Sequence, residues 1–229
     1  IQKLPADSAL FPSYDAALLR RELELFPEWF VSGLLDVSLD TQTRNMLDDL
    51  FAVLLKSAGE QPQVVVHRDF HSRNLLLMDD GGVGVIDFQD AVLGPVSYDL
   101  VSLLRDCYIR WPQALVERRV EDFRRQLLAQ AEAQGQPIAL PDSVAFLRWF
   151  DLMGLQRHLK VLGVFARLSL RDGKARYLDD LPLVLRYVLE VAQRYPETEG
   201  FYRWFVEYLE PKTTGQAWYR PWQSAGESR

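Results

Sequence analysis

The most informative residues of the chain lie in its first half, in His67-Arg68-Asp69-Phe70-His71-Ser72-Arg73-Asn74 and, thirteen residues after Asn74, in Asp87-Phe88-Gln89. A magnesium-assisted phosphoryl transfer needs one carboxylate that accepts or orients the proton of the attacking hydroxyl, and hard oxygen ligands for the ion. Asp69 offers that carboxylate, and Asn74 and Asp87 offer amide and carboxylate oxygens. The pattern therefore predicts Asp69 as the catalytic residue, and Asn74 and Asp87 as ligands of Mg²⁺.

A β hairpin is predicted directly after this stretch. Two short apolar runs flank a polar turn, in the order Leu75-Leu76-Leu77-Met78, Asp79-Asp80-Gly81-Gly82 and Val83-Gly84-Val85-Ile86. Asp80-Gly81 suits the positive φ angles of a tight primed turn. With a two-residue turn or a four-residue loop, residue 78 faces residue 83 and residue 74 faces residue 87. This register predicts that Asn74 and Asp87 lie side by side at the open end of the hairpin.

Helices are expected on both sides of this region. Before it, apolar residues recur at helical spacing over residues 14–35, with a kink or break at Pro27, and over residues 41–57, between Asp40 as N-cap and Gly59. After Pro95 the expected helices span about 97–110, 113–134, 142–170, 180–194 and 198–209. Their expected caps are Ser97, Asp142 and Asp180, and their expected stops are Gly135 and Gly173. The fold class that follows is mainly α (α+β), with a small β hairpin that carries the candidate site.

Composition excludes several classes of protein. The 229 residues are 48% hydrophobic, which suffices for a substantial core, and the net charge of -6 disfavours nucleic acid or an anionic membrane as partner. No uncharged apolar run reaches the roughly 18 residues that span a bilayer. The single cysteine, Cys107, cannot form an intrachain disulfide, which favours a reducing compartment. We therefore expect a cytoplasmic protein with no nucleic-acid and no membrane partner.

The central motif resembles a known family. His-Arg-Asp-x-x-x-x-Asn followed by Ile86-Asp87-Phe88 is similar to the catalytic loop and metal-binding segment shared by protein kinases and the aminoglycoside phosphotransferase superfamily. Gln89 stands where a protein kinase would have glycine, no Ala-Pro-Glu follows, and residues 94–100 resemble the corresponding region of the small-molecule phosphotransferases. The resemblance implies a protein-kinase-like fold, Mg²⁺ as cofactor, ATP as co-substrate and a small-molecule acceptor.

A narrower resemblance covers most of residues 10–195. Residues 66–111 and 156–174 are similar to the bacterial anomeric kinases of cell-wall amino sugars. This implies phosphorylation of the C1 hydroxyl of N-acetylmuramate or N-acetylglucosamine, in peptidoglycan recycling.

The same family places a small β lobe, which holds ATP, before the catalytic loop. Residues 1–60 contain no glycine-rich loop and have room only for the two helices that normally follow the hinge. The resemblance therefore predicts a C-terminal lobe whose N-terminal β lobe is absent, whose partner is that missing lobe of the same protein, and which is inactive alone. Its expected parts are two post-hinge helices (1–60), the catalytic loop and metal hairpin (63–99), a helical substrate subdomain (100–210) and a tail (211–229) that packs back onto the domain.

Further candidate residues surround the three central ones. We expect His67 and Arg68 to hold the catalytic loop by hydrogen bonds, and Asp99 to bond to that loop from the start of its helix. The candidates for binding the substrate are Asp90, Asp106, Arg157 and His158. For the two carboxylates the alternative is an ordinary solvated side chain, and for Arg157 and His158 it is a satisfied buried ion pair.

Two other functions fit the same sequence. An aminoglycoside or amino-alcohol kinase would need an acidic cleft for a cationic substrate, and the cationic residues Arg157, His158 and Lys160 argue against it. A non-catalytic binding protein would carry the same lobe without turnover.

Overall fold

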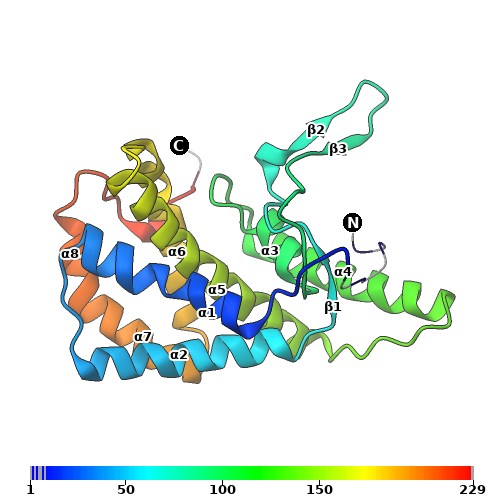
Figure 1. Cartoon of the computed structure of the whole chain (residues 1–229), viewed down its shortest axis with the longest axis horizontal. Helices are drawn as coiled ribbons and strands as arrows, with labels where there is room; N and C mark the ends of the chain where they lie inside the picture. Colours follow the sequence, from blue (N-terminus) through cyan, green and yellow to red (C-terminus); the bar gives the residue numbers. More distant parts are fainter. Residues whose placement is uncertain (1, 3, 5–6, 8, 228–229) are drawn as a thin grey trace. The chain divides into compact units, whose positions relative to one another are not determined.

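The structure is a computed structural model that describes residues 2, 4, 7 and 9–227 (Figure 1). The chain forms two compact units, one from Ile1–Asp15 and Ser57–Met153 and the other from Ala16–Lys56 and Gly154–Arg229. We call them the first and the second unit. No helix within the described residues combines the length and the apolarity that a membrane crossing needs.

Two small antiparallel sheets lie in the first unit. Strand β1 (Gln63–Val66) pairs with β4 (Val92–Pro95), with Val66 opposite Val92, and strand β2 (Leu75–Leu77) pairs with β3 (Val83–Val85). Val65, Val66 and Val92 are buried, so the β1–β4 pair belongs to the core of its unit, as expected for β-branched runs. The β2–β3 hairpin instead extends away from the helices of the same unit (Figure 1).

The register of the hairpin differs by one residue from the sequence-based prediction. Leu77 pairs with Val83 and Leu75 with Val85, so position 74 lies opposite 86, and the Ile86 amide donates to the Asn74 carbonyl at 3.1 Å. The physical reason is the turn. The Gly81 amide donates to the Met78 carbonyl at 2.9 Å and Gly81 has φ +80°, which is a three-residue loop closed by a left-handed glycine rather than a two- or four-residue loop.

The described residues of the first unit include helices and a 3₁₀ turn besides the strands. The helices include α3 (Tyr98–Leu104), α4 (Gln113–Ala133) and the start of α5 (Ser143–Leu170), and the turn is η2 (Ser72–Asn74). Asp142 caps α5, since its Oδ1 accepts from the Ala145 amide at 2.9 Å. The buried Arg105 guanidinium binds the buried Asp151 carboxylate at 2.6 Å, which joins the segment after α3 to α5.

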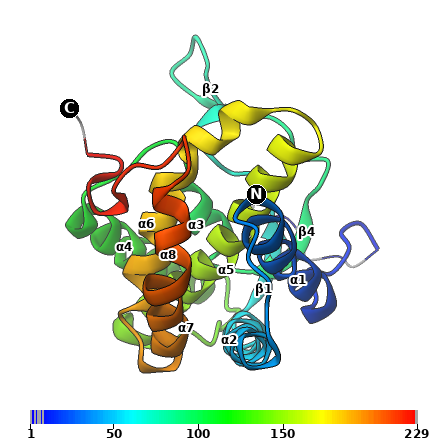
Figure 2. The ribbon, with the colours of Figure 1, turned by 90° about the vertical axis from the view of Figure 1, so that its left-hand side faces the viewer.

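Helices make up the second unit, and Figure 2 shows α2 almost end-on. They include α1 (Ala16–Leu23), the π-helix η1 (Phe26–Leu34), most of α2 (Thr41–Gly59), the part of α5 after Met153, α6 (Leu181–Ala192), α7 (Glu199–Trp204), the π-helix η5 (Phe205–Leu209), α8 (Glu210–Thr214) and the 3₁₀ turns η3 (Ala175–Asp180), η4 (Pro196–Thr198) and η6 (Trp222–Ser224). A Cβ atom on Gly163 would lie 2.3 Å from the Leu25 backbone, so glycine permits a close approach of α5 to the chain between α1 and η1.

Most of the predicted helices are present, with differences at their ends. After Pro27 the chain continues as a π-helix to Leu34, and the helix expected over 97–110 ends at Leu104. Ser97 and Asp180 make no side-chain cap bond, whereas Asp40 accepts from the Thr43 amide at 2.7 Å. In the tail, Trp218 and Trp222 are buried, and the Trp222 indole donates to Glu210 Oε1 at 2.9 Å.

Candidate active site

Two segments have an unusual backbone conformation: the loop between β1 and β2, which contains Arg68, and the chain just after β3, which contains Asp87. Arg68 has φ +74° and Asp87 has φ +69°, and only one other described non-glycine residue, Asp36, has a positive φ. Such conformations cost on the order of 1–3 kcal/mol each, and they persist only where surrounding contacts hold them. The contacts that hold these segments therefore determine where their side chains lie.

Asp99 fastens the start of the loop. Its Oδ2 accepts from the His67 amide at 2.8 Å and its Oδ1 accepts from the Arg68 amide at 3.1 Å, while the Asp99 side chain is buried at the start of α3. The His67 ring bonds through Nε2 to the Ile86 carbonyl at 2.9 Å. The loop is thus tied both to α3 and to the strand end that precedes Asp87.

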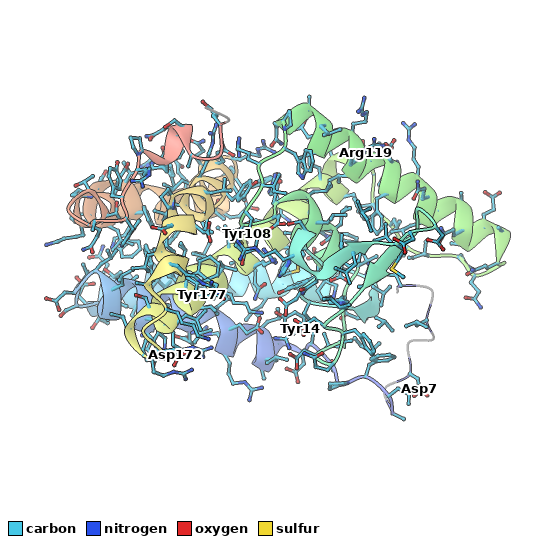
Figure 3. All side chains as sticks on the ribbon, turned by 90° about the horizontal axis from the view of Figure 1, so that it is seen from above. Asp7, Tyr14, Tyr108, Arg119, Asp172 and Tyr177 are labelled. Carbon is cyan, nitrogen blue, oxygen red and sulfur yellow. The ribbon has the colours of Figure 1, made fainter. Side chains whose placement is uncertain are left out.

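Further contacts hold the Arg68 side chain and the Asp69 backbone. The Arg68 guanidinium carbon lies 5.2 Å from the centre of the Tyr14 ring, which Figure 3 labels. The Asp69 carbonyl accepts from the His71 amide and from Asn74 Nδ2, both at 3.0 Å. The Asp69 carboxylate is half-buried and accepts no hydrogen bond from the described residues. A fixed backbone with an unengaged carboxylate is what a residue that takes a proton from a substrate requires.

Asn74 and Asp87 lie together in spite of the register difference. Asn74 Nδ2 approaches Asp87 Oδ2 at 3.5 Å, and Gln89 Nε2 donates to Asp87 Oδ1 at 2.7 Å. Asp87 follows the last paired residue, and its left-handed backbone redirects the chain at that point. The two residues therefore present an amide oxygen and an exposed carboxylate at the open end of the hairpin.

The chemistry of this donor pair fits Mg²⁺. That ion takes one or two protein carboxylates and completes its octahedral shell with water and substrate phosphates. Within the described residues there is no group of three or more His, Cys, Asp or Glu side chains that could hold a metal. Asn74 and Asp87 offer one amide oxygen and one carboxylate, which fits an ion that takes few protein ligands.

The four candidate substrate residues have different environments. Asp90 is exposed and accepts no hydrogen bond from the described part of the chain. Asp106 is buried, and its oxygens accept from Ser72 and Tyr108. Arg157 and His158 belong to the second unit, where both are buried and the His158 ring stacks on Tyr187 with centroids 4.8 Å apart.

Comparison with known proteins identifies the family. The model of the family described as "Phosphotransferase enzyme family" matches residues 1–150. The chain belongs to this phosphotransferase family. The match includes the whole loop and hairpin described above, from His67 to Gln89.

Curated relatives of this phosphotransferase carry one name. The chain is 48% identical over 196 residues to the N-acetylmuramate/N-acetylglucosamine kinase of Pseudomonas putida, which covers 86% of this chain and 56% of the relative. It is 45% identical over 210 residues to the kinase of the same name from Neisseria meningitidis, covering 91% and 60%. For the Caulobacter vibrioides kinase of that name the identity is 32% over 213 residues, covering 90% and 55%. The chain therefore spans a little over half the length of the relatives it matches.

The structure shows three contacts at the site that the sequence does not predict. Gln89 bonds to Asp87, Ser72 bonds to Asp106, and the Arg73 guanidinium carbon lies 3.3 Å from the centre of the Tyr108 ring. Of these three contacts, the sequence could have indicated only the one between Gln89 and Asp87, because these residues are two positions apart. The other two contacts join residues that are more than 30 positions apart, and no periodicity or motif indicates such a pair.

Proposed function

We propose that the full-length protein transfers the γ-phosphoryl group of ATP to the anomeric C1 hydroxyl of an amino sugar, N-acetylmuramate or N-acetylglucosamine. The observation that carries the proposal is the unengaged Asp69 carboxylate on a fixed backbone beside the Asn74–Asp87 pair. The printed names of the relatives, and identities of up to 48%, support the choice of acceptor.

In the proposed reaction Asp69 acts as the base. The C1 oxygen forms a bond to the γ-phosphorus as the bond from that phosphorus to the β,γ-bridging oxygen breaks, and ADP leaves with the electron pair of that bond. The proton of the C1 hydroxyl passes to the Asp69 carboxylate and then to solvent, which leaves sugar 1-phosphate. Asn74 Oδ1 and the Asp87 carboxylate would hold Mg²⁺, which when bound neutralises charge on the phosphate oxygens.

The remaining residues either hold the loop in its conformation or are proposed to bind the sugar. Asp99 and His67 keep the loop conformation through the bonds described above. We propose Asp90 as an acceptor of sugar hydroxyl hydrogen bonds, because its carboxylate is exposed and not engaged by the described residues. Arg157 and His158 stay predicted contacts of the acidic sugar, since a cationic guanidinium suits the carboxylate of N-acetylmuramate.

The test is an acceptor panel with full-length protein, MgATP and assay of ADP release, with the 229-residue chain beside it because the sequence predicts that the chain alone is inactive. We expect turnover with N-acetylmuramate and N-acetylglucosamine. Turnover with aminoglycosides or amino alcohols only would favour that branch of the family. Binding of a sugar without any ADP release would favour a non-catalytic binding protein, and would overturn the proposal.

A further inference from the structure

The Asp106 carboxylate is buried directly against the catalytic loop. Its exposed fraction is 1%, and it lies just after α3, within the first unit. Oδ2 accepts from the Ser72 amide at 3.1 Å and from the Ser72 hydroxyl at 2.5 Å, and Oδ1 accepts from the Tyr108 amide at 3.2 Å. Both oxygens are thus engaged by protein donors.

Ser72 is the residue through which this carboxylate acts on the loop. It begins the 3₁₀ turn η2, and the amides at the start of a helical turn have no acceptor within the turn itself. Asp106 supplies that acceptor from another part of the chain. Asn74 ends the same turn and donates to the Asp69 carbonyl. A shift of Ser72 would therefore move Asn74 and the Asp69 backbone together.

Tyr108 holds the residues on either side of Ser72. Its ring, labelled in Figure 3, lies edge to face with the His71 ring at 5.9 Å and beneath the Arg73 guanidinium at 3.3 Å. The Tyr108 amide also donates to Asp106, so the same carboxylate holds both Ser72 and the residue whose ring contacts His71 and Arg73. Such a contact set constrains the loop more than burial of a single side chain does.

We propose that Asp106 is a positioning residue, which fixes η2 so that Asp69 and Asn74 keep one relative geometry. Its link to catalysis rests on the function proposed above, whereas its hold on the loop does not. The alternative is that Asp106 binds the sugar directly. A positioning role predicts an effect on kcat that is the same for every accepted sugar, and a binding role predicts an effect on KM that differs between sugars.

Amide hydrogen exchange on the full-length protein without ligands tests the hold on the loop. Asp106→Asn preserves size but leaves one amide of Ser72 or Tyr108 facing an NH₂ group, and we expect exchange at residues 71–74 to rise about tenfold. The matched control is Asp122→Asn on α4, whose carboxylate lies at the surface and pairs, among the described residues, with Arg119 at 3.2 Å. Unchanged exchange at Ser72 in Asp106→Asn would overturn the proposal.

Ser72→Ala keeps the test decisive if Asp106→Asn fails to fold, because it removes only the hydroxyl bond to Asp106. We expect a smaller rise in exchange at the same residues, and no rise there would count against the proposal.

Kinetics of the full-length protein then separate positioning from binding. For Asp106→Asn we expect kcat to fall about tenfold with both sugars, and KM to stay within about twofold. A rise in KM for one sugar with kcat unchanged would assign Asp106 to the substrate instead. If the wild-type protein turns over no sugar, the proposed function fails, and the exchange experiment still decides whether Asp106 holds the loop.

Discussion

At the scale of single residues, the site depends on strained backbone that is held by buried carboxylates. Asp99 accepts hydrogen bonds from two backbone amides at the start of the loop, and Asp106 accepts one from the Ser72 amide. The Asp69 backbone is therefore held although its side chain accepts no hydrogen bond from the described residues. This division separates the groups that hold the loop from the group that reacts. It also makes Asp69 a residue whose replacement should affect turnover and not folding.

Asp69→Asn should lower kcat of the full-length protein by about 10²–10⁴-fold, the contribution typical of a positioned base. Thermal unfolding should be unchanged, because the Asp69 carboxylate accepts no hydrogen bond from described residues. Steady-state ADP release measures the first effect and calorimetry the second, with Asp122→Asn as the control. Turnover within about threefold of wild type would remove Asp69 from the mechanism.

At the scale of elements, the hairpin shows what sequence patterns resolve and what they miss. The two apolar runs and the Asp-Gly pair predict the hairpin correctly, because alternation and turn chemistry are local properties. The predicted register is wrong by one residue, because Asp80-Gly81 suits both a two-residue turn and the last two positions of a three-residue loop. Asn74 and Asp87 still meet, through the positive φ of Asp87, which no pattern indicates.

The left-handed glycine of this hairpin gives a matched pair of substitutions. Gly81→Ala should destabilise the protein by about 1 kcal/mol, because alanine is strained at φ +80°. Gly59→Ala is the control: a Cβ atom would meet nothing within 4 Å at either position, but only Gly81 has a positive φ. Alanine at Gly59 should be neutral or stabilise α2 by about 0.5 kcal/mol. Chemical denaturation measures both, and equal effects would contradict the conformational argument.

Helix α4 supplies a pH-dependent test. The guanidinium of Arg124, with that of Arg125, lowers the pKa of the Glu121 carboxyl from its ordinary 4.5 to about 2. The ion pairs therefore stabilise the folded state above pH 4.5, and this stabilisation is lost as the pH falls toward about 2. Glu121→Gln should cost about 1 kcal/mol at pH 7, reduced by solvent screening, and close to nothing at pH 2. A cost that does not change with pH would show that packing, not charge, is lost.

A close approach within the second unit can be tested in the same way. Gly163→Ala would place a Cβ atom 2.3 Å from the Leu25 backbone, which must then move. We expect a loss of about 2–3 kcal/mol in unfolding free energy, typical of overpacking. Gly59→Ala again serves as the control, and a Gly163→Ala protein as stable as wild type would contradict this packing.

At the scale of the whole molecule, the family and most helices follow from the sequence, and the finer support of the site does not. The motif from His67 to Asn74, together with Gln89 and residues 94–100, predicts membership of the phosphotransferase family, which the match over residues 1–150 confirms. Helical periodicity predicts α2, α4, α5 and α6 because burial of one face repeats along the chain. The π-helix after Pro27 and the Ser72–Asp106 contact arise from tertiary packing, so no local pattern predicts them.

The function proposed for the full-length protein is phosphorylation of the C1 hydroxyl of an amino sugar. Phosphorus NMR of the product formed from MgATP and N-acetylmuramate tests it most directly, because coupling between phosphorus and protons reports which oxygen carries the phosphate. We expect ADP together with a new phosphorus signal that is coupled to the anomeric proton. A phosphorus signal coupled only to the C6 protons, or ATP that stays unchanged, would contradict it.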